Sequence, residues 1–484
     1  MSDSYTSGNI AAMNIAEKID LDIFHKIGEV ADRECRECYV VGGYVRDLFL
    51  ERHSKDIDFV TVGSGIDLAR KVAESLGRKA KCNYFPRFGT AQVLTHGLEL
   101  EFVGARRESY RSDSRNPIVE DGTLDDDISR RDFTINAMAV SVNGATFGEL
   151  IDRFGGIADL EAGIIRTPLD PDITFSDDPL RMFRAIRFAT QLQFEIHPDT
   201  LAAISRNAHR ITILSKERIE TELTKIMMSP RPSIGWLLMQ RTGLLKIFFP
   251  DLDAMNGVEV IKGRGHKDNF LHTMEVLDKV AAATDNVWTR WAALLHDIAK
   301  PQTKRYDAKI GWTFHNHNFI GGKMVPRIFR NLKLPQNEHM KYVQKLVELH
   351  MRPIALVEEV TDSAVRRLIF DAGDDIDGLM TLCRADITSK NPEKVRTHLA
   401  NFDLVIEKMR IINEKDNLRN WQPPVDGNEI MEMFGIGQCR EVGIIKSYEK
   451  DMLVDCPTPN DRDLALRLVM EKAAELGLMP IKKA

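Results

Sequence analysis

The chain has 484 residues, of which 43% are hydrophobic. This length exceeds one ordinary core and favours about two to four domains. The net charge of -6 excludes a uniformly basic nucleic-acid-binding protein, so any contact with nucleic acid must come from local clusters of basic side chains. Six widely spaced cysteines exclude the dense disulfide framework of a small secreted domain.

The sequence carries no export or membrane signal. Its first 20 residues lack the basic segment and apolar core of a signal peptide, and no stretch approaches the about 18 uninterrupted apolar residues of a membrane span. We therefore expect a soluble, cytoplasmic protein with no membrane partner. No obligatory protein partner is indicated.

The N-terminal third predicts a helix followed by a sheet. Residues 12–37 have helical apolar spacing, and the CxxC pair Cys35 and Cys38 lacks a second Cys or His pair for zinc, so we expect two reduced thiols on a helix end. Short segments rich in Val, Leu and Phe and broken by Gly predict strands at CYVV, IDFVTVG, AQVLTHG and LELEFVGA, and a further one at INAMAVSVNG. Together they predict an α+β head over residues 20–166.

Helical patterns dominate the rest of the chain. After Pro168 strand signals nearly disappear, and DPLRMFRAIRFATQ places Met182, Ile186 and Ala189 on one helical stripe. We expect a helical neck over residues 167–255, a His-bearing helical domain over 260–390 and a helical tail over 391–484.

Paired carboxylates in the head predict a metal site. Asp56 and Asp58 lie two apart on a predicted strand, so both point to the same side. Glu99 and Glu101 are again two apart on a later strand, and one of them could supply a third carboxylate; we select Glu101. Oxygen ligands of this kind suit Mg²⁺ together with substrate phosphates, and two such ions can support nucleotidyl transfer.

A glycine pair next to these carboxylates predicts phosphate binding. Gly42 and Gly43 lie between a hydrophobic strand and a helical segment, where backbone amides can approach a phosphate. Arg46 and Asp47 follow on the first helical turn.

Five ordered segments resemble a known family. GGYVRD followed by KDIDFV resembles the catalytic motif of the polymerase-beta-like nucleotidyltransferases and, more narrowly, of class II tRNA nucleotidyltransferases and bacterial poly(A) polymerases. Four others are similar to the family's ribose-binding motif (DDDISRRDFTINAMA), its Gly-Gly hinge (DRFGGIADL), its nucleotide-selecting helix (DDPLRMFRAIRF) and its helix-capping motif (KERIETEL). The resemblance extends over about residues 38–250.

The resemblance implies the fold and activity. The fold would be α+β, a polymerase-beta-like nucleotidyltransferase head with a mixed sheet, followed by an all-α neck, an HD-type helical domain and a helical tail that binds tRNA. The activity would be template-independent addition of C and A, from CTP and ATP, to the 3′ end of tRNA, by two-metal transfer that releases pyrophosphate. The catalytic residues carried over are Asp56, Asp58 and Glu101, with Mg²⁺ on the two aspartates. The nucleotide-binding residues are Gly42, Gly43, Arg46, Arg130, Arg131, Asp132, Asn136, Asp178, Arg181, Arg184 and Arg187.

Base selection is assigned to one residue pair. In the family, an acidic residue and an arginine three positions later contact the Watson–Crick edge of the incoming base, and here these are Asp178 and Arg181. Residues at i and i+3 share a helix face, and together they offer acceptors and a forked donor. Asp177 replaces the glutamate usual in the family. We expect Arg184 and Arg187 further along the helix to contact phosphates.

Two features favour a tRNA nucleotidyltransferase over a poly(A) polymerase. YFPRFGTAQV stands where bacterial poly(A) polymerases have an Arg-rich stretch. GARRESYRSDSRNPIVEDGTLDDD has the length and polarity of the flexible loop that helps the family switch from C to A addition. Whether the chain adds CCA, CC or A alone stays open.

A second constellation resembles the HD phosphohydrolase superfamily. His272, the adjacent pair His296 and Asp297, and Asp386 match its core ligands in order, and His317 and His350 fall where two-metal members add ligands; His315 lies beside them. Imidazole and carboxylate together suit a transition metal such as Ni, Mn, Co or Fe, which could activate water for phosphoester hydrolysis.

Three alternatives stay open. The chain could be a poly(A) polymerase or A-adding enzyme, an HD phosphohydrolase whose head only binds RNA, or a non-enzymatic RNA-binding scaffold. The two aspartates of KDIDFV count against the last two. The HD metal, its substrate and the oligomeric state are not indicated.

Overall fold

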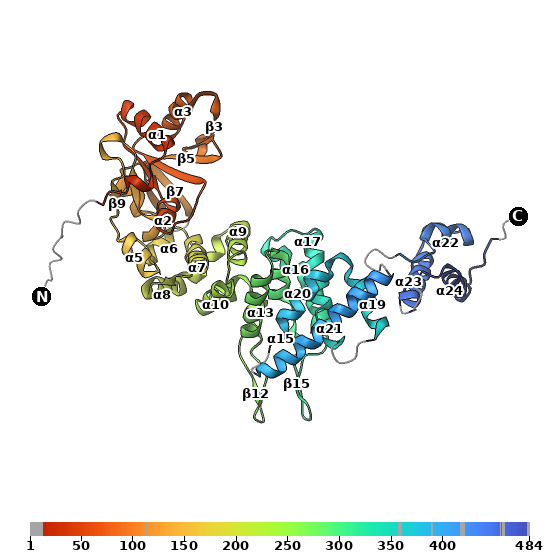
Figure 1. Ribbon diagram of the computed structural model, residues 1–484. Coiled ribbons are helices and arrows are strands. Elements are labelled where there is room, and N and C mark those ends of the chain that lie inside the picture. Colours follow the sequence, from red (N-terminus) through yellow and green to blue (C-terminus); the bar gives the residue numbers. More distant parts are fainter. Residues whose placement is uncertain are drawn as a thin grey trace. The chain divides into compact units, whose positions relative to one another are not determined.

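The computed structural model describes residues 13–111, 114–356, 361–388, 391–416, 422–454, 456 and 460–481. The chain forms two compact units (Figure 1). Unit 1 is Met1–Ile226 with Ile234–Phe249, and unit 2 is Met227–Ser233 with Pro250–Ala484. No helix within the described ranges combines the length and the hydrophobicity that crossing a membrane requires.

A mixed, seven-stranded sheet forms the head in unit 1, in the order β3-β4-β5-β2-β1-β8-β9. The strands are β1 (Cys38–Val41), β2 (Asp56–Thr61), β3 (Ala80–Phe85), β4 (Thr90–Thr95), β5 (Leu98–Gly104), β8 (Ala139–Ser141) and β9 (Leu150–Ile151). β2 and β5 are parallel, and the other neighbours are antiparallel. The predicted α+β class is therefore confirmed. The strand expected at INAMAVSVNG is shorter than predicted, because Thr134–Asn136 forms a 3-10 turn before β8.

Helices α1 (Asp22–Arg33) and α3 (Gly65–Leu76) cover one face of this sheet. Phe59 of β2 stacks on Phe102 of β5 with ring centroids 4.9 Å apart, and Phe24 of α1 meets Phe59 edge to face at 5.8 Å. The helix predicted over residues 12–37 is shorter, because a 3-10 turn at Ala16–Lys18 precedes it. The CxxC thiols are free, but only Cys35 follows the helix end; Cys38 begins β1 and is buried.

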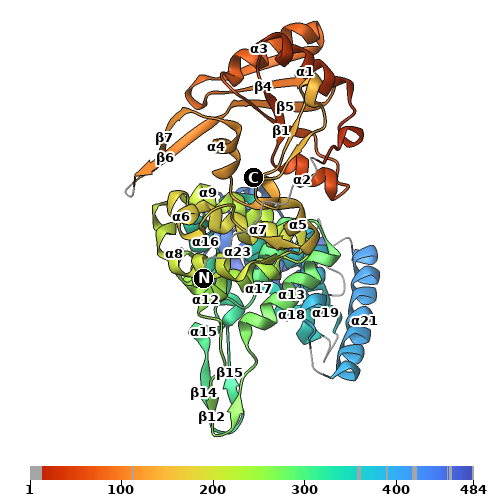
Figure 2. The same ribbon diagram turned by 90° about the vertical axis from the view of Figure 1, so that its left-hand side faces the viewer.

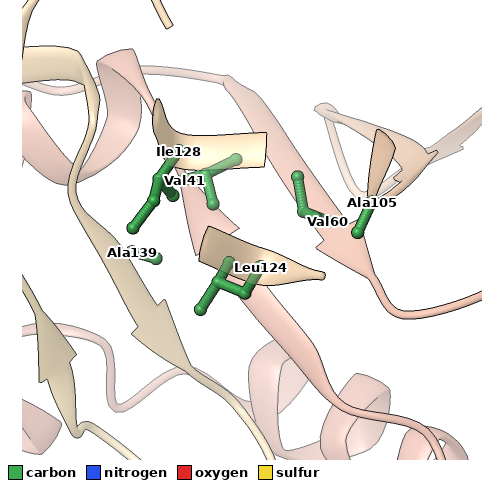
Figure 3. Close-up of a cluster of buried hydrophobic side chains, with 6 residues drawn as sticks. All are labelled: Val41, Val60, Ala105, Leu124, Ile128 and Ala139. Atoms are coloured by element: carbon green, nitrogen blue, oxygen red, sulfur yellow. The ribbon is translucent and has the colours of Figure 1, made fainter. Parts of the chain in front are cut away.

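The opposite face carries the predicted metal-binding carboxylates and a small apolar cluster (Figure 3). Val60 lies two residues after Asp58, and Val41 is in register with Asp58, so all three point to the same side. Leu124 and Ile128 of α4 (Leu124–Ser129) pack against them, together with Ala105 and Ala139. The cluster therefore fixes α4, and the residues that follow it, over the carboxylate-bearing face.

The segment predicted as a flexible loop is a β-hairpin. β6 (Arg106–Arg111) and β7 (Ser114–Asp121) pair antiparallel, with a register shift between Ser109 and Arg111. The backbone groups of the two segments pair with each other, and the expected flexibility of the loop stays a prediction.

Helices α2 (Gly43–Phe49) and α5 (Gly156–Ala162) complete the head. The neck is made of α6 (Pro171–Asp177), α7 (Leu180–Leu192), α8 (Pro198–Asn207), α9 (Lys216–Met227), α10 (Ser233–Arg241) and α11 (Leu244–Phe248). The predicted stripe of Met182, Ile186 and Ala189 on α7 is buried. A short parallel pair, β10 (Ile164–Ile165) with β11 (Glu195–Ile196), was not expected.

Unit 2 is mainly helical. Its helices are α12 (Pro250–Asp253), α13 (Asn269–Ala283), α14 (Val287–Leu295), α15 (Lys300–Thr303), α16 (His317–Leu332), α17 (Glu338–Leu349), α18 (Met351–Leu356), α19 (Asp362–Ala372), α20 (Ile376–Asp386), α21 (Pro392–Asp416), α22 (Gly427–Phe434), α23 (Arg440–Val454) and α24 (Arg462–Glu475). Two hairpins interrupt the helical pattern: β12 (Val260–Ile261) with β13 (Arg264–Gly265), and β14 (Arg305–Asp307) with β15 (Gly311–Thr313). Figures 1 and 2 show both hairpins projecting side by side from the helical body of this unit.

Candidate functional site

Acidic side chains line two parallel strands at the centre of the sheet. Asp56 and Asp58 of β2 are in register with Glu99 and Glu101 of β5. Both aspartates are exposed, while Ile57 between them is buried. The parallel register therefore places a glutamate beside each aspartate on the same face of the sheet.

The charges of these groups oppose one another. Crowding by protein atoms raises the pKa of Asp58, with Asp56 adding to the effect and Arg131 opposing it. Burial raises the pKa of Glu101, and the charges of Asp58 and Asp56 raise it further. Such a cluster of like charges is stabilised by a divalent cation. Glu99 accepts a hydrogen bond from Gln92 at 3.1 Å, so Glu101 is the better third ligand.

The head carboxylates converge less closely than the His and Asp groups of unit 2. Among the described residues, the sets of three ligand atoms that all lie within 4.8 Å of one another are found in unit 2. A cation in the head would therefore take further oxygens from substrate phosphates, as Mg²⁺ commonly does.

The glycine turn lies directly against this site. Gly42 has φ 73° and ψ -137° at the start of α2. A Cβ there would lie 3.0 Å from Nη1 of Arg131 and 3.5 Å from Oδ2 of Asp58. Glycine thus gives both the backbone conformation and the space that bring β1 next to Asp58.

Asp127, which the sequence analysis missed, positions two of the predicted arginines. Its carboxylate is fully buried and lies 2.5 Å from Nη2 of Arg130 and 2.9 Å from Nη2 of Arg131. Burial opposes its ionisation, but the two guanidinium groups outweigh burial and lower its pKa. The i+3 and i+4 spacing in DDDISRR was the signal that could have revealed it.

A second buried carboxylate connects the head to α7. Nε of Arg184 donates to Asp132 at 2.7 Å, and the side chain of Asn136 donates to the other oxygen at 3.1 Å. Arg46, in turn, donates to Asn136 at 2.9 Å and to Asp47 at 2.7 Å. Protein groups thus hold both Arg46 and Arg184, and their expected contacts with the nucleotide stay predictions.

The pair predicted to select the base spans the start of α7. Asp178 lies two residues before this helix, and its Oδ1 accepts from the Leu180 amide at 3.1 Å. Its Oδ2 accepts from Arg218 at 3.2 Å, and Arg181 donates to the carbonyl of Arg130 at 2.7 Å. The Arg181 amide still bonds to the Asp178 carbonyl at 3.0 Å, so the two residues stay one turn apart.

Arg187 packs between two helices of the neck. It is buried, and its Nε lies 2.9 Å from Oε2 of Glu222 on α9. Its guanidinium also lies 4.2 Å from the ring centroid of Phe188. Arg187 therefore joins α7 to α9, because Glu222 of the KERIETEL segment supplies its countercharge, and the expected phosphate contact stays a prediction.

The HD residues predicted from the sequence converge in the interior of unit 2. They form two groups, His272 with His296 and Asp386, and Asp297 with His317 and His350. Asp297 joins the groups: its Oδ2 lies 3.3 Å from Nε2 of His296, and its Oδ1 lies 3.3 Å from Nε2 of His317. His272 lies 2.8 Å from Asp386. His315 is exposed and belongs to neither group.

Backbone carbonyls orient three of these imidazoles. The Nδ1 atoms of His296, His317 and His350 lie 2.8, 2.8 and 2.7 Å from the carbonyls of Ala293, Phe314 and Val347, respectively. Donation from Nδ1 leaves each Nε2 lone pair facing the centre, as metal-ligating histidines require.

The electrostatics of this centre fit a cation. Nε2 of His296 is buried and lies 3.3 Å from Oδ2 of Asp297 and 3.6 Å from Oδ1 of Asp386. Burial disfavours its charged form, but pairing with Asp297 outweighs burial and raises its pKa to about 10. Burial also opposes ionisation of Asp386, yet hydrogen bonds from His272 and His296 lower its pKa. The donor set suits a transition metal.

Comparisons with known proteins match both the head and the HD region. Residues 38–166 match a poly A polymerase head domain, residues 193–256 match a probable RNA and SrmB-binding site of polymerase A, and residues 269–389 match an HD domain. An A-adding tRNA nucleotidyltransferase of Deinococcus radiodurans is 30% identical over 84% of this chain and 88% of its own length. A multifunctional CCA protein of Shewanella frigidimarina is 31% identical over 69% of this chain and 78% of its own length.

The fold is also that of solved enzymes. The structure of a CCA-adding enzyme, apo form II, superimposes with a TM-score of 0.64 at 23% identity, covering 95% of this chain and 99% of that one. The chain spans only 19% and 35% of the length of two further curated A-adding relatives. With at least 30% identity over most of the length of the two relatives above, the chain belongs to the class II tRNA nucleotidyltransferase family and carries an HD domain.

Proposed function

We propose that this chain adds C and A, from CTP and ATP, to the 3′ end of tRNA and releases pyrophosphate. The observation that carries the proposal is the register of β2 with β5, which sets Asp56 and Asp58 beside Glu101 on the open face of the sheet. Relatives named as A-adding and as CCA proteins support the choice of substrate.

In this proposal the carboxylates act by binding and orientation. Asp56, Asp58 and Glu101 would hold two Mg²⁺ ions, which when bound lower the cost of charge on the attacking and leaving oxygens. The 3′ oxygen of the tRNA bonds to the α-phosphorus of the nucleotide, and the bond to the bridging α–β oxygen breaks. Gly42 and Gly43 bring backbone amides towards the phosphates.

The arginines would fix the nucleotide. Asp127 orients Arg130 and Arg131, which we assign to the ribose and phosphates together with Asp132 and Asn136. Asp178 and Arg181 would select the base by offering acceptors and a forked donor to its Watson–Crick edge. Arg46 holds Asn136 and Arg184 holds Asp132 in place.

The test supplies purified protein with tRNA transcripts that lack CCA, lack CA or lack only A, with each nucleotide alone and with both. We expect C, then C, then A on the shortest transcript, with no further growth. Addition of A only to the transcript ending in CC would assign an A-adding enzyme, and a long A tail would assign a poly(A) polymerase. No addition to any transcript would refute the proposal.

We further propose that the chain divides into a head at 20–166, a neck at 167–255, an HD domain at 260–390 and a tail at 391–484. In this division the neck and the tail bind tRNA. The match of residues 193–256 to an RNA-binding model supports the neck. A chain truncated near residue 390 should bind tRNA more weakly, with a shallower salt dependence. Equal affinity would exclude the tail from binding.

A second candidate activity belongs to the HD centre. We propose that it binds a transition metal and hydrolyses a phosphoester, which is supported by the two convergent ligand groups and by Asp297, which faces both of them. The test measures metal content by mass spectrometry, and hydrolysis of a 2′,3′-cyclic nucleotide and of p-nitrophenyl phosphate. Bound metal without hydrolysis would leave a structural site, and no bound metal would refute the assignment.

A further inference from the structure

The two hairpins of unit 2 are basic within an acidic protein. We define the hairpin arm as residues 257–267, which include β12 and β13, together with residues 300–316, which include β14 and β15. These segments contain seven lysines and arginines and two acidic residues, whereas the whole chain has a net charge of -6. A concentrated basic segment of this kind attracts a polyanion.

Aromatic rings join the two hairpins. The ring of His266 meets those of Trp312 and Phe314 edge to face, with centroids 5.3 and 5.8 Å apart, and Tyr306 meets Trp312 at 5.3 Å. Lys304 also pairs with Glu259 across the hairpins. Tyr306, Trp312 and Phe314 are each half-buried, so none of the three residues is fully enclosed by the protein.

Lysine ammonium groups lie over these rings. Nζ of Lys304 is 5.4 Å from the centroid of Trp312, and Nζ of Lys300 is 5.7 Å from that of Phe314. Alternating cations and accessible aromatic faces offer contacts both to a phosphate backbone and to unpaired bases. If the binding partner were an acidic protein, it would pair with the lysines but would have few groups that stack on the aromatic rings.

The arm starts at the metal centre. Nζ of Lys300 lies 2.6 Å from Oδ2 of Asp297, and Nζ of Lys267 lies 2.9 Å from Nδ1 of His272. The outer parts of the hairpins carry exposed Val260 and Ile310, and both views show them away from the helical body of unit 2 (Figures 1 and 2). A strand that follows the arm inward therefore reaches the ligand groups.

We propose that the hairpin arm binds single-stranded RNA, with phosphates on its lysines and bases stacked on Trp312 and Tyr306, and leads one end of the strand to the HD centre. The strand must be single because base faces in a duplex are already stacked. This binding does not depend on nucleotide addition by the head or on hydrolysis at the HD centre.

The first experiment maps the binding site on the full chain. An oligouridine of about six nucleotides, a length typical of single-stranded sites, carries 4-thiouridine and is crosslinked by light before peptide mapping. We expect crosslinked peptides from residues 257–267 or 300–316, and competition by unlabelled single strand but not by duplex. Crosslinks confined to other segments, or equal competition by duplex, would overturn the proposal.

The second experiment separates charge from fold. K262Q with K309Q removes two exposed charges from the arm, and K333Q with K341Q removes, as a control, one exposed charge at the end of α16 and one on α17. Binding is followed by the yield of arm crosslinks at several salt concentrations. The slope of log affinity against log salt should decrease by about 1.4 for the arm variant, about 0.7 for each phosphate that is no longer neutralised, and should not change for the control. Equal slopes in the two variants would overturn the proposal.

The third experiment tests stacking. Trp312→Leu should lower the arm affinity at least about fivefold, and Trp312→Phe should largely preserve it. Metal content and circular dichroism report whether either variant disturbs the hairpins. If Trp312→Leu disturbs them, the charge variants of the second experiment test RNA binding by the arm instead. Equal affinity of a folded Trp312→Leu variant would exclude stacking.

Discussion

At position 42, glycine is required by backbone conformation and by space together. Gly42 and Gly77 share nearly the same backbone angles, φ 73° and ψ -137° against φ 65° and ψ -145°. A Cβ at Gly42 would crowd Arg131, whereas one at Gly77 would meet nothing within 4 Å. A substitution at Gly42 should therefore disturb both the backbone and the proposed active site, whereas one at Gly77 should disturb the backbone alone.

We predict that Gly42→Ala and Gly77→Ala each lower the free energy of unfolding by about 1–3 kcal/mol, because both impose a conformation that alanine rarely adopts. Gly42→Ala alone should also slow nucleotide addition by more than about tenfold, since it displaces groups next to Asp58. Denaturation and single-turnover addition check this. Equal loss of activity in both variants would contradict a local role for Gly42.

Removal of the Asp127 carboxylate should disturb the proposed nucleotide site through the arginines that it positions. Its fully buried carboxylate neutralises Arg130 and Arg131. Asp127→Asn should lower the free energy of unfolding by about 3 kcal/mol, because it leaves partly buried cations without a countercharge, and should raise KM for ATP and CTP.

Asp125→Asn on the same helix is the matched control. Its ion pair with Arg153 is 66% and 62% exposed on the two sides, so the unfolding free energy should change by about 0.5 kcal/mol or less. If Asp127→Asn behaved like Asp125→Asn in denaturation and in KM, the positioning role of Asp127 would be disproved.

At the scale of single elements, α23 carries a buried acid. Glu449 accepts from the Val425 amide at 3.0 Å, and burial raises its pKa above the ordinary 4.5. The folded state therefore holds this proton to a higher pH than the unfolded chain, so stability is lost as pH rises through the folded pKa.

We predict that Glu449→Gln is more stable than wild type at pH 7 to 8 and that the difference shrinks as pH falls towards about 4.5. Urea denaturation across pH measures it, with exposed Glu432→Gln on α22 as the control. A difference that is independent of pH, or that reverses sign, would refute the assigned cause.

Local patterns predicted the elements that carry the proposed chemistry. The strand at KDIDFV, the helix after Gly42 and the stripe on α7 follow from spacing that neighbouring residues determine. The hairpins β12–β13 and β14–β15 were not predicted, because their strands are only two or three residues long and rely on ring contacts between distant segments. The hairpin β6–β7 was missed because its polar sequence lacks the apolar alternation of a half-buried strand.

Residue roles were harder to predict than elements. The register that pairs Asp58 with Glu101 depends on two strands about 40 residues apart in the chain, so strand spacing alone did not separate Glu99 from Glu101. Arg46, Arg184 and Arg187 were all expected at the nucleotide, but the partners that hold them belong to other elements. Motif spacing therefore identifies the candidate residues but does not predict which side chains from other elements they contact.

At the scale of the whole molecule, the two proposed metal sites belong to different compact units. The head offers carboxylates, which bind Mg²⁺ loosely, whereas unit 2 offers imidazoles with carboxylates, which bind transition metals more tightly. We predict that His296→Ala with Asp297→Ala removes a bound transition metal and any phosphoester hydrolysis, and changes nucleotide addition with Mg²⁺ less than about twofold.

His315→Ala is the control for this prediction, because its exposed side chain lies outside both ligand groups. Metal content, hydrolysis and tRNA extension are measured side by side. Loss of nucleotide addition in a folded double variant would show that the two sites are coupled.

We propose above that the carboxylates of β2 are required for nucleotide addition to tRNA. The most direct test of this role compares the rates at which wild type, Asp58→Ala and Asp67→Ala extend a tRNA that lacks CCA; the exposed side chain of Asp67 lies on α3. We predict that Asp58→Ala lowers the rate at least about a thousandfold, about 4 kcal/mol of activation free energy, while tRNA affinity and the rate of Asp67→Ala stay near wild type. Extension by Asp58→Ala at the wild-type rate would contradict the account.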